Sequence, residues 1–283
     1  NKEQKPSGIL PEGFVLDKEI KMRAGFFQYD VGRVWEENKG KIEQALKEQN
    51  LELIVLPELC GCGYLFESKE ELASVAERIP QGKTTEDLCR LSREYHCAIV
   101  AGLPEWEEGK IYNSAVVVSE GEFIGKYRKI HLSDFEKNFF EKGNQCSVFC
   151  VKGVKIGVQI CFDLWFPEIA REQIRNGADL FCVPANFGGE SSHLIARVRA
   201  MENLTPMILC NRVGVEKNTK MDASFLGRSS IIGADGSWLV EGEDNVQRST
   251  GSEISFAEKK NVICSDFLAE MSCHYPDKNK DGQ

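Results

Sequence analysis

The sequence lacks the long hydrophobic run that a membrane-spanning helix needs, since no window of about 18 apolar residues occurs in it. Positive charge is also scarce: 35 basic against 44 acidic residues give a net charge of −9, so we expect no general nucleic-acid surface. The first residues, Asn1 to Gly8, are polar and do not resemble a secretory signal. We therefore expect no membrane partner and a cytoplasmic location.

Histidine is scarce as well, and the cysteines lack a regular spacing. The chain has 4 histidines and 11 cysteines, and an odd number without framework spacing argues against a disulfide scaffold. The close pairs Cys60 with Cys62 and Cys146 with Cys150 lack the paired spacing of a zinc site. We expect no metal, a reducing compartment, and four buried cysteines within apolar runs: Cys97, Cys182, Cys210 and Cys264.

Apolar runs alternate with amphipathic helical patterns along most of the 283 residues, which are ample for a large core. The expected strands are 21–29, 51–56, 97–102, 113–119, 122–127, 155–161, 179–184, 206–212, 228–233, 237–240 and 253–256. The expected helices are 33–49, 69–77, 85–95 (capped by Thr84 or Thr85), 167–176 and 191–203. The Glu120-Gly121 and Asp235-Gly236 corners predict antiparallel hairpins.

No linker or change of composition marks a domain boundary. We therefore predict one domain over residues 1–283, with a core at about 21–257, an N-terminal extension at 1–20 and a C-terminal tail at 258–283. Mixed parallel and hairpin strands with helices on their faces indicate an α/β sandwich.

Three polar side chains lie at or near the ends of apolar runs, where they are candidates for catalysis. Glu58 follows the apolar run 53–56, Lys129 lies in the segment 126–132, and Cys161 ends the run from Val154 and precedes a helix starting at Pro167. A carboxylate, a lysine and a cysteine can supply a base, an oxyanion stabiliser and a nucleophile. This set suits acyl transfer at an amide or nitrile carbon.

Each candidate also has an ordinary interpretation. Cys161 can be a small buried hydrophobe, and Lys129 can belong to a solvated basic edge with Lys126 and Arg128. However, a position before a helix N-terminus favours a thiolate and a developing oxyanion at Cys161. The residues around Glu58 carry no charge, and such surroundings raise a carboxyl pKa and suit a proton shuttle.

Taken in chain order, three segments resemble the motifs of the nitrilase, or carbon–nitrogen hydrolase, superfamily. They are Leu56-Pro57-Glu58 with Gly63-Tyr64, the lysine segment Tyr127-Arg128-Lys129-Ile130-His131-Leu132, and the cysteine segment 157–168. Segment 197–203 is similar to the family's Arg-Ala-x-Glu-Asn helix. Any one of these motifs would be weak evidence for the family, whereas three of them in the family's order are strong evidence. The resemblance implies a single-domain αββα sandwich with two mixed sheets, assembled as a homodimer or larger homo-oligomer.

The family also uses a second glutamate, within a Glu-x-x-x-Phe-x-x-Gly pattern. Segment 136–143 fits this pattern with Glu136 in the glutamate position, and Glu141 is a competitor. The ordinary alternative for Glu136 is a loop carboxylate paired with Lys137 or Arg128.

The resemblance implies a cysteine hydrolase that needs no metal or organic cofactor. In that scheme Glu58 takes the proton of Cys161, and Lys129 with the backbone N–H of Phe162 stabilises the oxyanion. Glu58 then protonates the leaving nitrogen, which leaves a thioester and releases ammonia or an amine. Water activated by Glu58 or Glu136 frees the acid.

The substrate of such an enzyme would be a small amide, ureide or nitrile. Relatives that act on acids often place arginine three or four residues after the cysteine, where this sequence has Leu164 and Trp165. This points away from D-carbamoylases and ω-amidases. The Cys-x-Asp-x-Trp-Phe-Pro-Glu string is more similar to carbamoylputrescine amidases, which act on a ureido group of a cationic chain. Candidate substrate-binding residues are Trp165, Asn186 and Phe187.

Several alternatives stay open at this point. Arg212 or Arg228 could hold a substrate carboxylate from elsewhere in the fold. A Cys–His hydrolase would pair Cys161 with His131 or His193. The chain could instead be a nitrilase acting on a C≡N group, or a non-catalytic binding protein with the same fold, although such a protein would not need all three catalytic residue types. A membrane acyltransferase of the superfamily is not expected without spanning segments.

Overall fold

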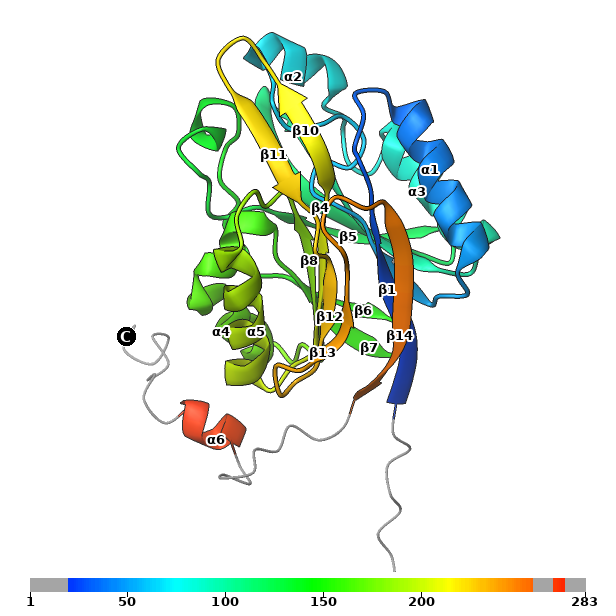
Figure 1. The fold of residues 1–283 in the computed structure, drawn as a ribbon, viewed down its shortest axis with the longest axis vertical. Helices are drawn as coiled ribbons and strands as arrows, with labels where there is room; N and C mark the ends of the chain where they lie inside the picture. Colours follow the sequence, from blue (N-terminus) through cyan, green and yellow to red (C-terminus); the bar gives the residue numbers. More distant parts are fainter. Residues whose placement is uncertain (1–19, 257–266, 273–283) are drawn as a thin grey trace, which may run out of the picture.

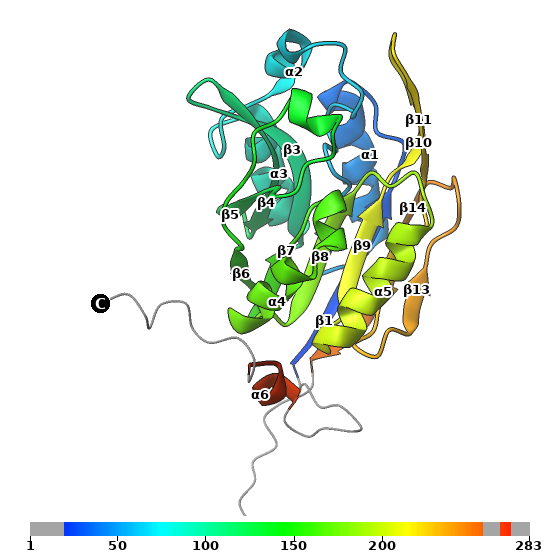
Figure 2. The ribbon, with the colours of Figure 1, turned by 90° about the vertical axis from the view of Figure 1, so that its left-hand side faces the viewer.

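The computed structural model describes residues 20–256 and 267–272, which form two six-stranded mixed sheets packed face to face. The first sheet has the order β14-β1-β2-β3-β4-β5 and the second the order β13-β12-β9-β8-β7-β6. Helices α1 and α3 cover the outer face of the first sheet, and α4 and α5 lie side by side on the outer face of the second (Figures 1 and 2). This arrangement confirms the predicted αββα sandwich.

Some strands are followed by a helix and others directly by the next strand. The strands are β1 (Ile20–Gln28), β2 (Leu53–Val55), β3 (Ala98–Glu107), β4 (Lys110–Ser119), β5 (Glu122–Arg128), β6 (Val148–Val151), β7 (Val154–Val158), β8 (Leu180–Ala185), β9 (Met207–Asn211), β10 (Val213–Lys217), β11 (Asp222–Leu226), β12 (Ser230–Ile232), β13 (Trp238–Glu241) and β14 (Arg248–Phe256). The helices are α1 (Trp35–Glu48), α2 (Lys69–Val75), α3 (Lys83–Glu94), α4 (Pro167–Arg175), α5 (Ser191–Asn203) and α6 (Phe267–Ser272), with short 3-10 turns η1 (Glu136–Asn138) and η2 (Cys161–Trp165).

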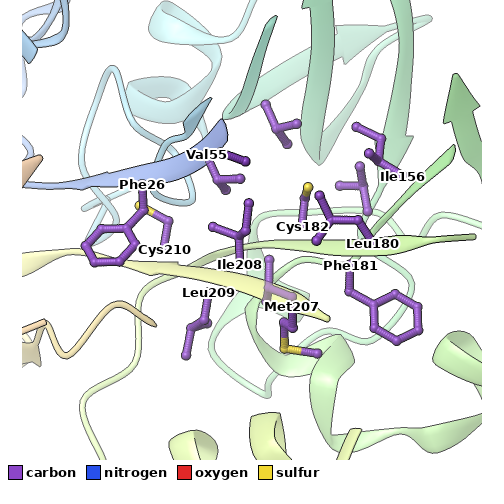
Figure 3. Packing of buried hydrophobic residues seen from close by; sticks show 14 of the residues in the cluster. Phe26, Val55, Ile156, Leu180, Phe181, Cys182, Met207, Ile208, Leu209 and Cys210 are labelled. Carbon is purple, nitrogen blue, oxygen red and sulfur yellow. The ribbon is translucent and has the colours of Figure 1, made fainter. Parts of the chain in front are cut away.

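The largest core lies between the two sheets and continues beneath α4 and α5. Cys182 of β8 and Ile208 of β9 point toward Phe26 and Val55 of the first sheet, whereas Phe181 points the other way, toward the helices (Figure 3). Strands buried on both faces read as continuous apolar runs, which is why β2 and β8 are apolar throughout. Each fully buried aliphatic or aromatic side chain contributes about 1.5–3 kcal/mol to this packing.

Several sequence-based boundaries differ from the structure. The strand predicted to reach Cys161 ends at Val158, and Cys161 instead opens the turn η2. The predicted threonine cap of α3 is wrong, because α3 begins at Lys83 and the N-cap position, Gly82, has no side chain to provide one. The carboxylate of Glu77 accepts hydrogen bonds from this first turn instead.

Other predictions have mixed outcomes. The boundaries of α5 match the expected helix, and both hairpin corners are present. Strand β6 was not predicted, although its four residues, Val-Phe-Cys-Val, form a short apolar run. The β10–β11 ribbon was also not predicted, because charged and exposed residues interrupt its pattern. Cys97, Cys182 and Cys210 are buried as expected. The predicted extension and tail fall mostly outside the described residues, as does Cys264. Among the described helices, none has the length and hydropathy to cross a membrane.

Candidate active site

Four elements bring the catalytic candidates to one end of the sandwich. Glu58 follows β2, Lys129 follows β5, Glu136 opens η1 and Cys161 opens η2. The ends of parallel strands commonly build such sites, because their loops converge on one edge of a sheet. All four side chains are buried, and the most exposed, Cys161, has 7% of its surface accessible.

Lys129 lies between the two glutamates. Its Nζ is 2.7 Å from Glu58 Oε1 and 2.5 Å from Glu136 Oε1. Glu136 Oε2 in turn accepts a hydrogen bond from the backbone N–H of Ser133 at 2.9 Å. The competing glutamate, Glu141, is exposed and pairs through its backbone with Ile111. The geometry therefore joins Glu136, and not Glu141, to the lysine.

Asn113 is a member of this cluster that the sequence analysis missed. Its Nδ2 donates to Glu58 Oε1 at 2.7 Å and to Glu136 Oε1 at 3.2 Å. The sequence held one signal that could have indicated it, which is an asparagine next to the apolar run of the predicted strand, now β4. Asn113 therefore helps Lys129 to hold the two carboxylates in place.

The two glutamates differ in their electrostatic surroundings. Burial raises the pKa of Glu58, and the charge of Glu136 adds to the rise, against the effect of Lys129. Burial also acts on Glu136, but Lys129 and the hydrogen bonds from Ser133 outweigh it and lower its pKa. Glu58 Oε2 is buried without a hydrogen-bond partner in the described part of the chain. One carboxylate is thus suited to carry a proton and the other to stay ionised.

Cys161 has a strained backbone conformation. Its φ is +48°, a left-handed value that non-glycine residues rarely adopt and that is found more often at functional sites. The next residue, Phe162, lies in the first turn of η2, where backbone N–H groups have no partner within the turn. Burial and the charge of Glu58 raise the pKa of the Cys161 thiol, although Lys129 opposes them. Burial therefore opposes the thiolate that a position before a helix favours, which fits the expectation that Glu58 takes the thiol proton.

The three predicted substrate-binding residues lie at the end of η2 and directly after β8, an element in contact with η2. The indole of Trp165 is 43% exposed and donates to Ser192 Oγ at 3.2 Å. The backbone of Asn186 hydrogen bonds to the Cys161 thiol, and both polar atoms of its buried side chain lack a partner among the described residues. Phe187, the next residue, is buried and packs against His193. Asn186 is therefore the best placed of the three to meet a polar ligand.

An aromatic wall close to the catalytic candidates was not predicted, although Tyr64 itself belongs to the glutamate motif. Tyr64 packs against Phe135 and Phe225, with ring centroids 5.7 and 6.0 Å apart. Its hydroxyl lies close enough to Glu136 and Lys129 for their charges to affect its pKa, which burial raises. The wall comes from three separate loops and strands, so no single sequence motif could reveal it.

The two histidines of the rival Cys–His interpretation have other partners. His131 Nδ1 lies 3.1 Å from Asp163 Oδ1, and its ring stacks on Phe166. His193 packs edge-on against Phe187, and burial together with Arg228 lowers its pKa to about 4. Neither histidine hydrogen bonds to the cysteine within the described residues, so the geometry does not support a Cys–His pair.

The two arginines considered as carboxylate clamps are already paired. Arg212 is fully buried, where it binds the carboxylate of Glu216 and lies 3.3 Å from Asp30 Oδ1. Arg228 binds Asp244 through two nitrogens and lies 3.2 Å from a Glu190 oxygen. Neither offers a free guanidinium to a substrate carboxylate.

A comparison with known protein families gives a match over most of the chain. The model of the carbon-nitrogen hydrolase family matches residues 22–255. The chain belongs to this family. It is therefore a hydrolase that acts on carbon–nitrogen bonds other than peptide bonds.

Relatives with different names are similar to this chain. A nitrilase of Pyrococcus abyssi is 44% identical over 69% of the chain and 75% of its own length. An N-carbamoylputrescine amidase of Solanum lycopersicum is 30% identical over 72% of this chain and 75% of its own length. The omega-amidase NIT3 of Saccharomyces cerevisiae is 29% identical over 80% of this chain and 81% of its own length.

A solved structure of a carbon-nitrogen hydrolase from Helicobacter pylori shares the fold with a TM-score of 0.76. It is 27% identical, and the likeness covers 85% of this chain and 91% of that one. In the described part of the chain, no group of three or more His, Cys, Asp or Glu side chains is placed to hold a metal ion.

Proposed function

We propose that this hydrolase cleaves small primary amides or ureides through a thioester on Cys161. The observation that carries the proposal is the position of Lys129, which lies between two buried carboxylates of opposite pKa shift. The free oxygen of Glu58 and the raised pKa of Cys161 fit a base and a nucleophile that must exchange a proton.

The first step is attack on the carbonyl carbon. Glu58 Oε2 takes the thiol proton as the sulfur of Cys161 bonds to carbon, and the carbonyl oxygen gains negative charge. The ammonium of Lys129 and the backbone N–H of Phe162 stabilise this oxyanion. The unpaired amide of Asn186 binds the polar end of the substrate.

The second step releases nitrogen. Protonated Glu58 gives its proton to the leaving nitrogen, the carbon–nitrogen bond breaks, and ammonia or an amine departs from the thioester. Glu58, again ionised, takes a proton from water, and the resulting attack frees the acid and restores the thiol. Glu136 stays ionised throughout, because its pKa is lowered, and it balances the charge of Lys129.

We further propose that the acyl chain is neutral or cationic. Arg212 and Arg228 are engaged by carboxylates, and Leu164 and Trp165 occupy the positions where an arginine clamp is expected. An exposed tryptophan face attracts a cation by about 0.5–2 kcal/mol. The similarity to an N-carbamoylputrescine amidase supports this choice, whereas the similarity to an omega-amidase favours an acidic substrate.

A nitrile substrate is the second candidate, favoured by the similarity to a protein named nitrilase. Ammonia release from a panel of primary amides, ureido compounds and nitriles separates these classes, with Cys161→Ala as the control. Release from amides or ureides alone supports the proposal, and release from nitriles alone favours the second candidate. No turnover by the folded wild type across the whole panel would favour a binding protein.

We also propose that a second copy of the chain packs on α5. Leu194, Val198 and Met201 lie at helical spacing and are 64%, 41% and 46% exposed. Buried residues of the same helix, among them Ala196 and Ala200, face the core. An apolar stripe left open on a helix is typical of an interface, and the family resemblance implies an oligomer. The cytoplasmic location stays a prediction.

A further inference from the structure

Asp163 is a fully buried carboxylate that binds two separate segments of the chain. Its Oδ1 accepts hydrogen bonds from the backbone N–H groups of His131 at 2.8 Å and Ile130 at 3.2 Å, and lies 3.1 Å from His131 Nδ1. Its Oδ2 accepts from the hydroxyl of Tyr127 at 2.8 Å and from the backbone N–H of Ile160 at 3.1 Å. Both oxygens are thus fully used.

These partners flank the nucleophile and the lysine of the proposed mechanism. Lys129 lies between Tyr127 and Ile130, and Cys161 lies between Ile160 and Asp163. The lysine segment continues β5 of the first sheet, whereas η2 follows β7 of the second. Within the described residues, no backbone hydrogen bond joins segments 127–132 and 158–163. The carboxylate of Asp163 is therefore the polar link between the sheets at this point.

The strained turn at Cys161 also depends on this residue. A left-handed backbone persists only where its surroundings hold it in place. Asp163 holds this turn twice, since its backbone N–H donates to Ile160 O at 3.0 Å and its carboxylate accepts from Ile160 N. The same side chain therefore fixes the direction of the cysteine and the place of the lysine segment.

We infer that Asp163 is a positioning residue, which sets the distance between the Lys129 ammonium and the Cys161 sulfur. The inference rests on the proposed function, in which the sulfur bonds to the carbonyl carbon while the ammonium stabilises the oxyanion on that carbon. A misplacement of about 1 Å can cost about 100-fold in rate, so a link that fixes the spacing acts on kcat. Asp163 itself touches neither the substrate nor the reacting atoms.

The substitution Asp163→Asn tests this role. Asparagine keeps one acceptor oxygen, but its NH2 group must face either Ile160 N–H or the N–H groups of the lysine segment, so one side of the link is lost. We expect kcat to fall about 100-fold with KM changed less than about threefold, since orientation in the transition state is affected more than binding. The milder substitution Tyr127→Phe removes one hydrogen bond to Asp163 and places no N–H group against another. Its kcat should lie between those of Asp163→Asn and the wild type.

Glu77→Gln is the matched control. Glu77 is likewise a carboxylate that accepts several hydrogen bonds, here three of 2.9 Å from Thr84 N, Thr85 N and Thr85 Oγ1 at the start of α3. Its loss should lower the melting temperature and leave kcat per folded molecule unchanged. The comparison separates a loss of stability from a loss of alignment.

The measurements are kcat and KM for an amide substrate, the melting temperature, and the alkylation rate of Cys161 by iodoacetamide. The inference is supported if two results are found together. Folded Asp163→Asn must lose more kcat than Glu77→Gln at a similar melting temperature, and Cys161 must be alkylated more slowly in Asp163→Asn than in the wild type. It is overturned if folded Asp163→Asn keeps kcat within about threefold of the wild type. Should Asp163→Asn fail to fold, Tyr127→Phe decides in the same way, full kcat overturning the inference. Activity retained by Cys161→Ala would overturn the proposed function itself, whereas an inactive Cys161→Ala beside a fully active Asp163→Asn overturns only the positioning role.

Discussion

The ammonium group of Lys129 lies 2.7 Å from Oε1 of Glu58, and neither side chain exposes more than 1% of its surface. A buried pair of this kind is expensive to assemble, and it is strongly destabilising to break because one charge is left without a partner. Here Glu136 adds a second negative charge to the same lysine. The cluster therefore carries a net charge of −1 when all three groups are ionised, and raising the pKa of Glu58 relieves it.

Replacement of the lysine is the first prediction. Lys129→Ala should lower kcat by roughly 10²–10³-fold, because it removes an oxyanion stabiliser worth about 3–4 kcal/mol. It should also lower stability by about 3–5 kcal/mol, since two buried carboxylates lose their cation. Steady-state kinetics on the folded fraction and thermal unfolding measure the two effects. A decrease in kcat below about tenfold would mean that Lys129 has no role in the chemistry.

The pH dependence of kcat/KM is the second prediction. Glu58 must be ionised to act as base, and burial raises its pKa, so activity should rise with pH along an acid limb above the ordinary carboxyl value of about 4.3. Glu136 affects stability rather than activity, and its pKa is lowered in the folded protein where that of Glu58 is raised. Its contribution is complete above about 4.3 and is lost as the pH falls through the lower, folded-state pKa. An acid limb at or below the ordinary value would contradict the assignment of Glu58.

Substrate charge is the third prediction. With Arg212 and Arg228 engaged, N-carbamoylputrescine should be hydrolysed faster than α-ketoglutaramate under identical conditions. Trp165→Ala should slow the cationic substrate by no more than about 30-fold, the equivalent of a cation–π contact of 2 kcal/mol. Faster hydrolysis of the acid would show that a carboxylate site lies outside these residues.

Association through α5 is the fourth prediction. Light scattering after size exclusion at micromolar concentration should give at least the mass of two chains. Val198→Glu should release monomers, because it places a charge in the centre of the exposed stripe. Lys69→Glu, on α2, is a control that should leave the mass unchanged. A wild-type monomer at this concentration would remove the proposed interface.

Much of this fold could be predicted because local patterns agree with tertiary structure. The helix α5 carries an apolar stripe and the strands β2 and β8 are apolar throughout, so their type is unambiguous. The β10–β11 ribbon was missed because its alternation is interrupted by charged and exposed residues. Its buried Glu216 binds the backbone N–H groups of Tyr64 and Leu65, a long-range contact that no local pattern encodes.

In the candidate site, too, local motifs could be predicted from the sequence and long-range contacts could not. Glu58, Lys129, Glu136 and Cys161 belong to motifs with fixed residue order, and the structure brings the first three into contact. Asn113 and the aromatic wall around Tyr64 could not be predicted, because they depend on which strands become neighbours. The burial of Cys161, which raises the pKa of its thiol, could not be read from its place before a helix, because it depends on the segments that pack around the turn η2.

Identification of the acylated residue tests the central claim most directly. Wild-type protein should be mixed with a turned-over amide, quenched in acid within the first turnovers, digested and analysed by mass spectrometry. The account predicts the mass of one acyl group on the peptide that contains Cys161, and no adduct with Cys161→Ala. An acyl group on Cys60 or Cys62, or ammonia release by Cys161→Ala at the wild-type rate, would contradict it.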